Sequence, residues 1–132
     1  MKQNIHYACY DEILSEAHRA GVYHGLDLKP TPMVVEDHVN VLDDNSDVKH
    51  AYYVPSGVCG FAYIITNEHG NSKFVKYLKS IGEGNKYYYG GYYVKWVREF
   101  GQSLEKKEAY ARAYAGVLKT YGIDVYINSR MD

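Results

Sequence analysis

Two cysteines and six histidines are the side chains in this sequence best suited to act as nucleophiles or bases. Cysteine catalysis needs a nearby base and an oxyanion site. No histidine stands at a diagnostic spacing from Cys59, which lies within a run of β-forming residues. We therefore interpret Cys59 as a strand residue and predict no catalytic residue and no enzymatic activity. Without C-x-x-C spacing, Cys9 and Cys59 are expected to be free and mostly buried.

Metal-ligating residues occur in two places without completing a site. His6 and Cys9 are three residues apart on a predicted helix near Asp11 and Glu12, but four ligands in closed spacing are not present. The acidic run 43–47 contains Asp43, Asp44 and Asp47 but lacks the ligand order and terminal Glu of an EF-hand, which favours a turn or cap. The glycines form neither a Walker A loop nor a G-x-G-x-x-G turn. We expect no metal and no cofactor.

The densest group of distinctive residues is basic and aromatic and lies between residues 73 and 98. Lysines can neutralise phosphates while exposed rings stack on unpaired bases. Tyr, Trp and Arg are also the side chains that most often anchor protein interfaces. A solvated lysine face with structural tyrosines would use the same residues without any ligand. The predicted binding residues are Lys73, Lys76, Lys79, Lys86, Tyr87, Tyr89, Tyr92, Trp96 and Arg98.

The elements that must position these residues fit one small domain. The chain has 132 residues, 46% hydrophobic and 23% charged, which predicts a single domain over 1–132. The formal net charge is −1, yet residues 1–47 carry −6 and residues 48–132 carry +5. This asymmetry is typical of a face for an anionic partner or of two halves that pair with each other. No apolar run approaches the about 20 residues of a membrane helix, and no signal peptide is apparent, so we expect a soluble intracellular protein without a membrane partner.

Local patterns predict the order α-β-β-β-α-β-α-β. Apolar residues at three- and four-residue steps indicate a first helix over 5–20 that stops at Gly21. An extended connector follows, so residues 1–28 either pack on the sheet or form a docking arm. Segments 51–54 and 58–66 flank Pro55-Ser56-Gly57, which is typical of a hairpin. The remaining elements are strands over 33–35, 92–98 and 123–127 and helices over 72–81 and 104–121. The fold class is α+β, a two-layer sandwich with a mostly antiparallel sheet of about five strands and about three helices.

Several segments resemble, in the same order, small uncharacterised accessory proteins of tailed bacteriophages. The resemblance spans residues 29–132 and excludes the first helix. It implies a context, a phage protein made in bacterial cytoplasm, and no catalytic residues. The segments are PTPMVV at 30–35, LDDNS at 42–46, GVCGFA at 57–62, GNSKF at 70–74, YGG at 89–91, GQS with EKK at 101–107, and SRMD at 129–132.

These observations together predict a non-enzymatic phage accessory protein that acts by binding. The expected partner is a host protein or complex, in host takeover or anti-defence, and the expected surface is the Lys/Tyr-rich segment 73–98. Binding of single-stranded nucleic acid by that segment is the alternative. A virion or assembly role, an enzyme of unrecognised type and homo-oligomerisation stay open, and the expected location is the cytoplasm of the infected bacterium.

Overall fold

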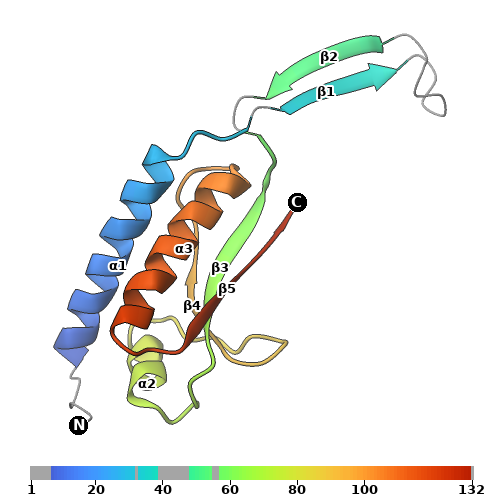
Figure 1. Ribbon diagram of the computed structural model, residues 1–132. Helices are drawn as coiled ribbons and strands as arrows, with labels where there is room; N and C mark the ends of the chain where they lie inside the picture. The colour runs from blue at the N-terminus through green and yellow to red at the C-terminus, as the bar shows by residue number, and fades with distance from the viewer. Residues whose placement is uncertain (1–6, 32, 39–47, 55–56, 132) are drawn as a thin grey trace.

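The computed structural model describes residues 7–31, 33–38, 48–54 and 57–131 (Figure 1). The chain is an α+β protein, and its elements follow the order that the sequence predicts. They are α1 (Tyr7–Asp27), β1 (Met33–His38), β2 (Val48–Val54), β3 (Gly60–Thr66), α2 (Lys73–Ser80), β4 (Tyr92–Trp96), α3 (Leu104–Thr120) and β5 (Val125–Met131).

The five described strands form two separate antiparallel sheets, so the prediction of about five strands in one sheet is wrong. The central sheet has the order β4-β3-β5, and β1 pairs with β2 in a hairpin that projects from the body (Figure 1). The predicted pairing of segment 51–54 with 58–66 is also wrong. Instead β2 pairs with β1, with Met33 opposite Val54. Gly57 shows why: its φ is 75°, and a Cβ there would lie 2.5 Å from the Thr31 carbonyl. The entry and exit of the hairpin are thus held together, and the chain turns into the body.

One face of the central sheet is covered by helices. α3 packs on β3 and β5, and α1 packs along α3 (Figure 1). Because successive strand residues point to opposite faces, alternate residues of the strands enter this core. The described part of α1 shares the core with the sheet. The core residues are Tyr10, Ile13 and Ala17 of α1, Ala62 and Ile64 of β3, Phe74, Tyr77 and Leu78 of α2, Tyr110, Ala111, Tyr114, Ala115 and Leu118 of α3, and Val94, Val97, Ile123 and Val125.

The first helix continues past Gly21, where the sequence predicts its end. Gly21 and Gly25 are buried, and a Cβ on them would lie 2.6 Å from the Tyr110 ring and 2.4 Å from the Phe100 ring, respectively. With Ala17, these glycines recur at four-residue spacing, which places them on one face of the helix. Gly21 is therefore a point of close helix packing. The expected helix end at Gly21 is incorrect, because this glycine serves the contact with Tyr110, a residue far away in the sequence.

Both cysteines are free, as expected, but Cys9 is exposed and Cys59 is half-buried. The prediction of a buried thiol at Cys9 is therefore wrong. The buried stripe of α1 passes through the neighbouring Tyr10 and continues to Ile13 and Ala17, which leaves Cys9 beside it.

The later helices begin at the expected caps. The Ser72 hydroxyl accepts a hydrogen bond from the Val75 N–H at 3.1 Å, and the Ser103 hydroxyl accepts one from Lys106 at 3.4 Å. Each bond satisfies a backbone donor that the first turn of a helix leaves unpaired. Gly122, with a φ of 81°, follows α3 at the position where a left-handed residue commonly ends a helix.

Candidate binding surface

The face of the central sheet opposite the helices is lined with aromatic side chains. The strand register places Tyr63 opposite Trp96 on one side and Asn128 on the other. Ile65 lies in the same way between Tyr93 and Tyr126. We call this surface the open face and define it by Phe61, Tyr63, Ile65, Tyr93, Trp96, Tyr126, Asn128 and Arg130.

Ring contacts make the open face one continuous layer. The rings of Tyr63 and Trp96 are stacked, with centroids 4.9 Å apart and planes 12° from parallel. Phe61 lies 5.7 Å from Trp96, and Tyr93 meets Tyr63 edge-on at 5.5 Å. Such pairs contribute about 0.5–1.5 kcal/mol each beyond burial. Phe61, Tyr93, Trp96 and Tyr126 are only partly buried, so the layer still offers ring surface to a partner.

A short turn adds two nearly bare rings to this layer. We call residues 87–91 the tyrosine turn. Its backbone is fixed by hydrogen bonds from the Gly90 N–H to the Tyr87 carbonyl at 3.0 Å and from the Tyr87 N–H to the Gly91 carbonyl at 2.8 Å. Tyr87 is buried against Tyr63 and Tyr93. By contrast, Tyr88 and Tyr89 are 89% and 79% exposed.

The turn is attached to the sheet by polar contacts. The Tyr126 hydroxyl donates to the Gly90 carbonyl at 3.3 Å, and the Asn128 side-chain amide donates to the Tyr87 hydroxyl at 2.9 Å. Gly90 and Gly91 have φ angles of 106° and 93°, which residues with a Cβ rarely adopt. The sequence therefore folds here into a turn that holds its exposed rings in place.

Burial and one cation set the electrostatics of the open face. Burial raises the pKa of Tyr63 to about 12, the hydrogen bond with Tyr87 adds to the rise, and the Arg130 guanidinium opposes it. Burial also raises the pKa of Tyr93, again against the charge of Arg130. These hydroxyls are therefore neutral hydrogen-bonding groups at physiological pH. The Arg130 guanidinium lies 5.5 Å from the Phe61 ring centroid.

The structure divides the residues predicted to bind a partner. Trp96 is on the open face, Tyr87 and Tyr89 belong to the tyrosine turn, and Lys86 is exposed just before it. Arg98 is exposed after β4. The remaining four lie together elsewhere: Lys73, Lys76 and Lys79 are exposed on α2, and Tyr92 lies beneath Lys79.

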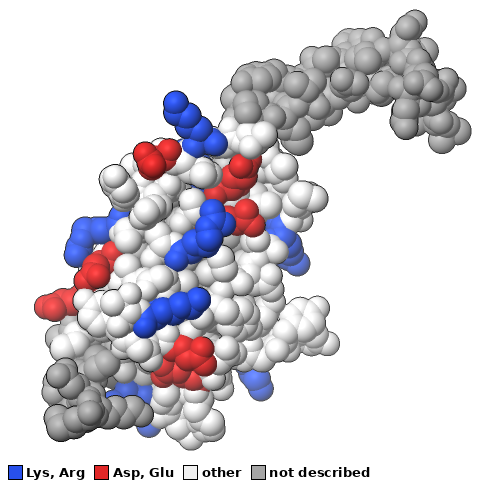
Figure 2. All heavy atoms as spheres, in the orientation of Figure 1, with Lys and Arg blue, Asp and Glu red and all other residues white. Residues whose placement is uncertain are grey.

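The lysines of α2 are thus separated from the open face. The Lys79 ammonium lies 5.1 Å from the Tyr92 ring centroid. Tyr92 precedes Tyr93 in β4, so the two side chains point to opposite faces. On the side of the molecule that carries α1 and α3, Lys and Arg are interspersed with Asp and Glu (Figure 2). This mixture is typical of a solvated surface.

Sequence reasoning missed the contributions of β3 and β5 to this surface. Phe61 and Tyr63 alternate with core residues in β3, and Tyr126, Asn128 and Arg130 alternate in β5. The sequence signal for these residues was the period-two alternation in both segments, which indicates a strand with different side chains on its two faces. Only the pairing of the two strands puts their outward residues beside each other.

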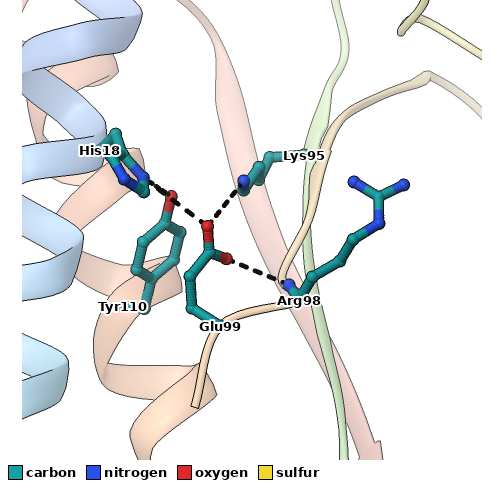
Figure 3. A network of polar contacts seen from close by, with 5 residues as sticks. All are labelled: His18, Lys95, Arg98, Glu99 and Tyr110. Atoms are coloured by element: carbon teal, nitrogen blue, oxygen red, sulfur yellow. Dashed lines mark hydrogen bonds and ion pairs between the residues drawn. The ribbon is translucent and has the colours of Figure 1, made fainter. Parts of the chain in front are cut away.

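A second constellation joins α1, β4 and α3 (Figure 3). His18 Nδ1 lies 2.6 Å from the Tyr110 hydroxyl and 3.8 Å from Glu99 Oε2. The Lys95 ammonium donates to Glu99 Oε2 at 3.1 Å, and the Arg98 N–H donates to Glu99 Oε1 at 3.1 Å.

Burial and the neighbouring charges shift two pKa values in this network in opposite directions. Burial alone would raise the pKa of Glu99, but the hydrogen bonds from Lys95 and the backbone lower it. Burial, with the nearby charge of Glu99, raises the pKa of Tyr110. The network links three elements across the core boundary.

Among the described residues, no three His, Cys, Asp or Glu side chains are placed to hold a metal ion. His6 and the acidic run 43–47, considered above as ligands, lie outside those residues. The described helices also include none with the length and apolarity that crossing a membrane requires. The sequence matches no protein-family model, and no curated protein or solved structure shows a significant match to it.

Proposed function

We propose that this is a non-enzymatic binding protein whose contact surface is the open face together with the tyrosine turn. One observation carries the proposal: Tyr88 and Tyr89, 89% and 79% exposed, are held on a hydrogen-bonded turn that continues into a layer of half-buried rings. Each exposed ring leaves apolar area in water, and burying it contributes roughly 25 cal/mol per Å². An ordered aromatic surface of this kind favours a partner.

The composition of the surface favours a protein as that partner. Tyr, Trp and Arg are enriched among the residues that carry most of the binding energy at protein interfaces, and all three occur here. The turn is already ordered, so little conformational entropy is lost when its rings are covered. The resemblance to phage accessory proteins supports a host protein or complex in the bacterial cytoplasm, with host takeover or anti-defence as the outcome.

The test is affinity capture from bacterial lysate with the tagged protein, with and without nuclease. The variant combines Tyr88→Ala with Tyr89→Ala, and its matched control is Tyr23→Ala, another exposed tyrosine at 68%. We expect wild type and the control to retain a protein partner that survives nuclease. The double variant should weaken its capture about tenfold or more, the effect of losing interface anchors. Equal capture by all three proteins would contradict the proposed surface.

Single-stranded nucleic acid is the second candidate, favoured by the presence of Arg130 on the open face and Lys86 beside the tyrosine turn. Rings that stack on bases and cations that contact phosphates are the usual parts of such sites. Its test is oligonucleotide binding measured at increasing salt. Affinity that falls steeply with salt and is lost in a Lys86→Glu, Arg130→Glu variant would support this function. A flat salt response would exclude it.

A further inference from the structure

The hairpin of β1 and β2, which we call the arm, is a two-stranded sheet with no third strand in the described chain. It projects from the body and does not fold back on the central sheet (Figure 1). A two-stranded hairpin alone is marginally stable in water, and a third strand or a packing surface stabilises it. No described strand pairs with its two outer edges, and such unpaired edges are templates for a further strand. Pairing with another sheet would therefore stabilise the arm, and its outer edges carry the backbone groups that such pairing needs.

The body offers one free sheet edge of matching length. β5 is the outer strand in the order β4-β3-β5, and no other described strand pairs with its second edge. The opposite edge, at β4, is partly occupied. There the Gly84 N–H donates to the Tyr93 carbonyl at 3.1 Å, and the Tyr93 N–H donates to the Asn85 carbonyl at 2.8 Å. β5 has seven residues and β1 has six, so the two strands match in length. On β5 the Ser129 N–H donates to Asn128 Oδ1 at 2.9 Å, and the Asn128 side chain has to release it when a strand is added there.

Charge distinguishes the arm from the body. Residues 33–54 contain five acidic side chains and one lysine, a net charge of −4, and the rest of the chain carries +3. Two of the acids, Glu36 and Asp37, are in β1 itself. On β5, Arg130 is exposed, and its guanidinium lies 5.5 Å from the Phe61 ring centroid. No described carboxylate forms an ion pair with Arg130. Arg130 is thus an exposed cation near the end of β5, and β1 carries two acids. The Glu108 carboxylate accepts a hydrogen bond from the Ser129 hydroxyl of the same strand.

We propose that the arm of one copy adds to the free edge of β5 in a second copy, through β1, so that two chains exchange arms in a symmetric dimer. The exchange is reciprocal, which closes the assembly at two copies. Opposite charge favours this pairing, because β1 carries Glu36 and Asp37 and β5 carries Arg130. The tyrosine turn lies at the far end of the sheet from the arm (Figure 1), so it stays available for another partner. This dimer does not depend on the function proposed above.

Charge reversal tests the dimer in solution. Molar mass is measured by light scattering or sedimentation over a range of concentrations for three proteins: wild type, Glu36→Lys with Asp37→Lys, and Arg130→Glu. We expect wild type to dimerise and each reversed protein to dissociate, with Kd raised about tenfold or more by like charges in contact. An equimolar mixture of the two reversed proteins should dimerise again, because each of its two contacts then joins opposite charges.

The mixture distinguishes a contact between two chains from a contact within one chain. Mixing the two variants restores opposite charges only when the contact is between chains. The matched control combines Asp27→Lys and Arg112→Glu, exposed on α1 and α3, and should dimerise like wild type. Thermal unfolding of every variant establishes that each is folded. Any of three results would overturn the proposal. The wild type could be monomeric at all concentrations, the charge-reversed variants could dimerise as well as wild type, or their equimolar mixture could stay monomeric. The Tyr88→Ala, Tyr89→Ala variant should keep the dimer, so loss of one proposal leaves the other standing.

Discussion

Gly21 and Gly25 occupy places in α1 where a single methyl group would meet another ring. Glycine is unfavourable inside a helix because it orders a flexible backbone, and it costs about 1 kcal/mol relative to alanine. Here that cost is offset by the close approach of α1 to Tyr110 and Phe100. Gly116, in α3, has open space where its missing Cβ would lie. The two kinds of helical glycine should therefore respond in opposite directions to the same substitution.

The first prediction compares these glycines. Gly21→Ala should lower the free energy of unfolding by about 1–3 kcal/mol, because the methyl group must displace the Tyr110 ring from a packed core. Gly116→Ala should raise it by up to about 1 kcal/mol through helix propensity alone. Urea unfolding followed by circular dichroism measures both. A Gly21→Ala protein as stable as wild type would show that the seam between α1 and α3 is loosely packed.

A second prediction concerns the hydroxyl of Tyr63. Its pKa is raised to about 12 by burial first and then by Tyr87. As the pH rises above the ordinary value of about 10, the unfolded chain releases this proton while the folded chain keeps it. The unfolded state is thereby favoured, so stability is complete below about pH 10 and declines toward about pH 12.

This decline should reach up to about 1.4 kcal/mol per pH unit for each such group. In Tyr63→Phe the contribution of this hydroxyl is absent, so the free energy of unfolding should fall less steeply with pH than in wild type. Urea unfolding at several pH values above neutrality measures the two slopes. Identical slopes would mean that Tyr63 ionises at the same pH in the folded and unfolded chains.

At the scale of the element, local signals were reliable and pairing signals were not. The caps Ser72 and Ser103 and the order of eight elements follow from side chains that act on their own neighbourhood. The pairing partner of β2 does not follow from such local signals. The Pro55-Ser56-Gly57 segment has the composition of a hairpin turn, but that composition does not determine whether β2 pairs with β3 or with β1. β2 pairs with β1 since the contact of Gly57 with Thr31 closes the base of the arm.

The candidate surface shows the same limit. The tyrosine-rich segment was visible in the sequence, and the structure places Trp96 on the open face and Tyr89 on its exposed turn. The sequence also grouped the lysines of α2 with these rings, since all lie within residues 73–98. A helix and a strand that are adjacent along the chain can present opposite sides of a sheet. That separation is a property of the layers and is not encoded in spacing.

The third prediction tests a single helix start. Ser72→Ala should lower the free energy of unfolding by about 1 kcal/mol, because the Val75 N–H loses its acceptor at the first turn of α2. Ser72→Asp is the matched control, since aspartate both caps and favours the positive end of the helix dipole. Denaturant unfolding measures both variants. Equal loss in the two would mean that the hydroxyl acts through contacts other than capping.

For the molecule as a whole, the central sheet carries two different surfaces at its two ends. The arm leaves the body beside Gly60, at the start of β3, whereas the tyrosine turn packs beside Ile65 and Tyr126 at its end (Figure 1). The helices occupy the remaining face. The proposed dimer uses the edge of β5 and leaves the tyrosine turn exposed, so a dimer would present two copies of that turn.

The stack of Tyr63 on Trp96 also makes the protein its own optical probe. The chain has one tryptophan, Trp96, and sixteen tyrosines, so excitation energy absorbed by the tyrosines is transferred to a single indole. That indole lies on the open face, half-buried and in contact with Phe61, Tyr63 and Tyr93. A molecule that covers the face changes the polarity around the indole and shifts its emission. Unlabelled protein in a cuvette thus reports on the occupancy of this surface.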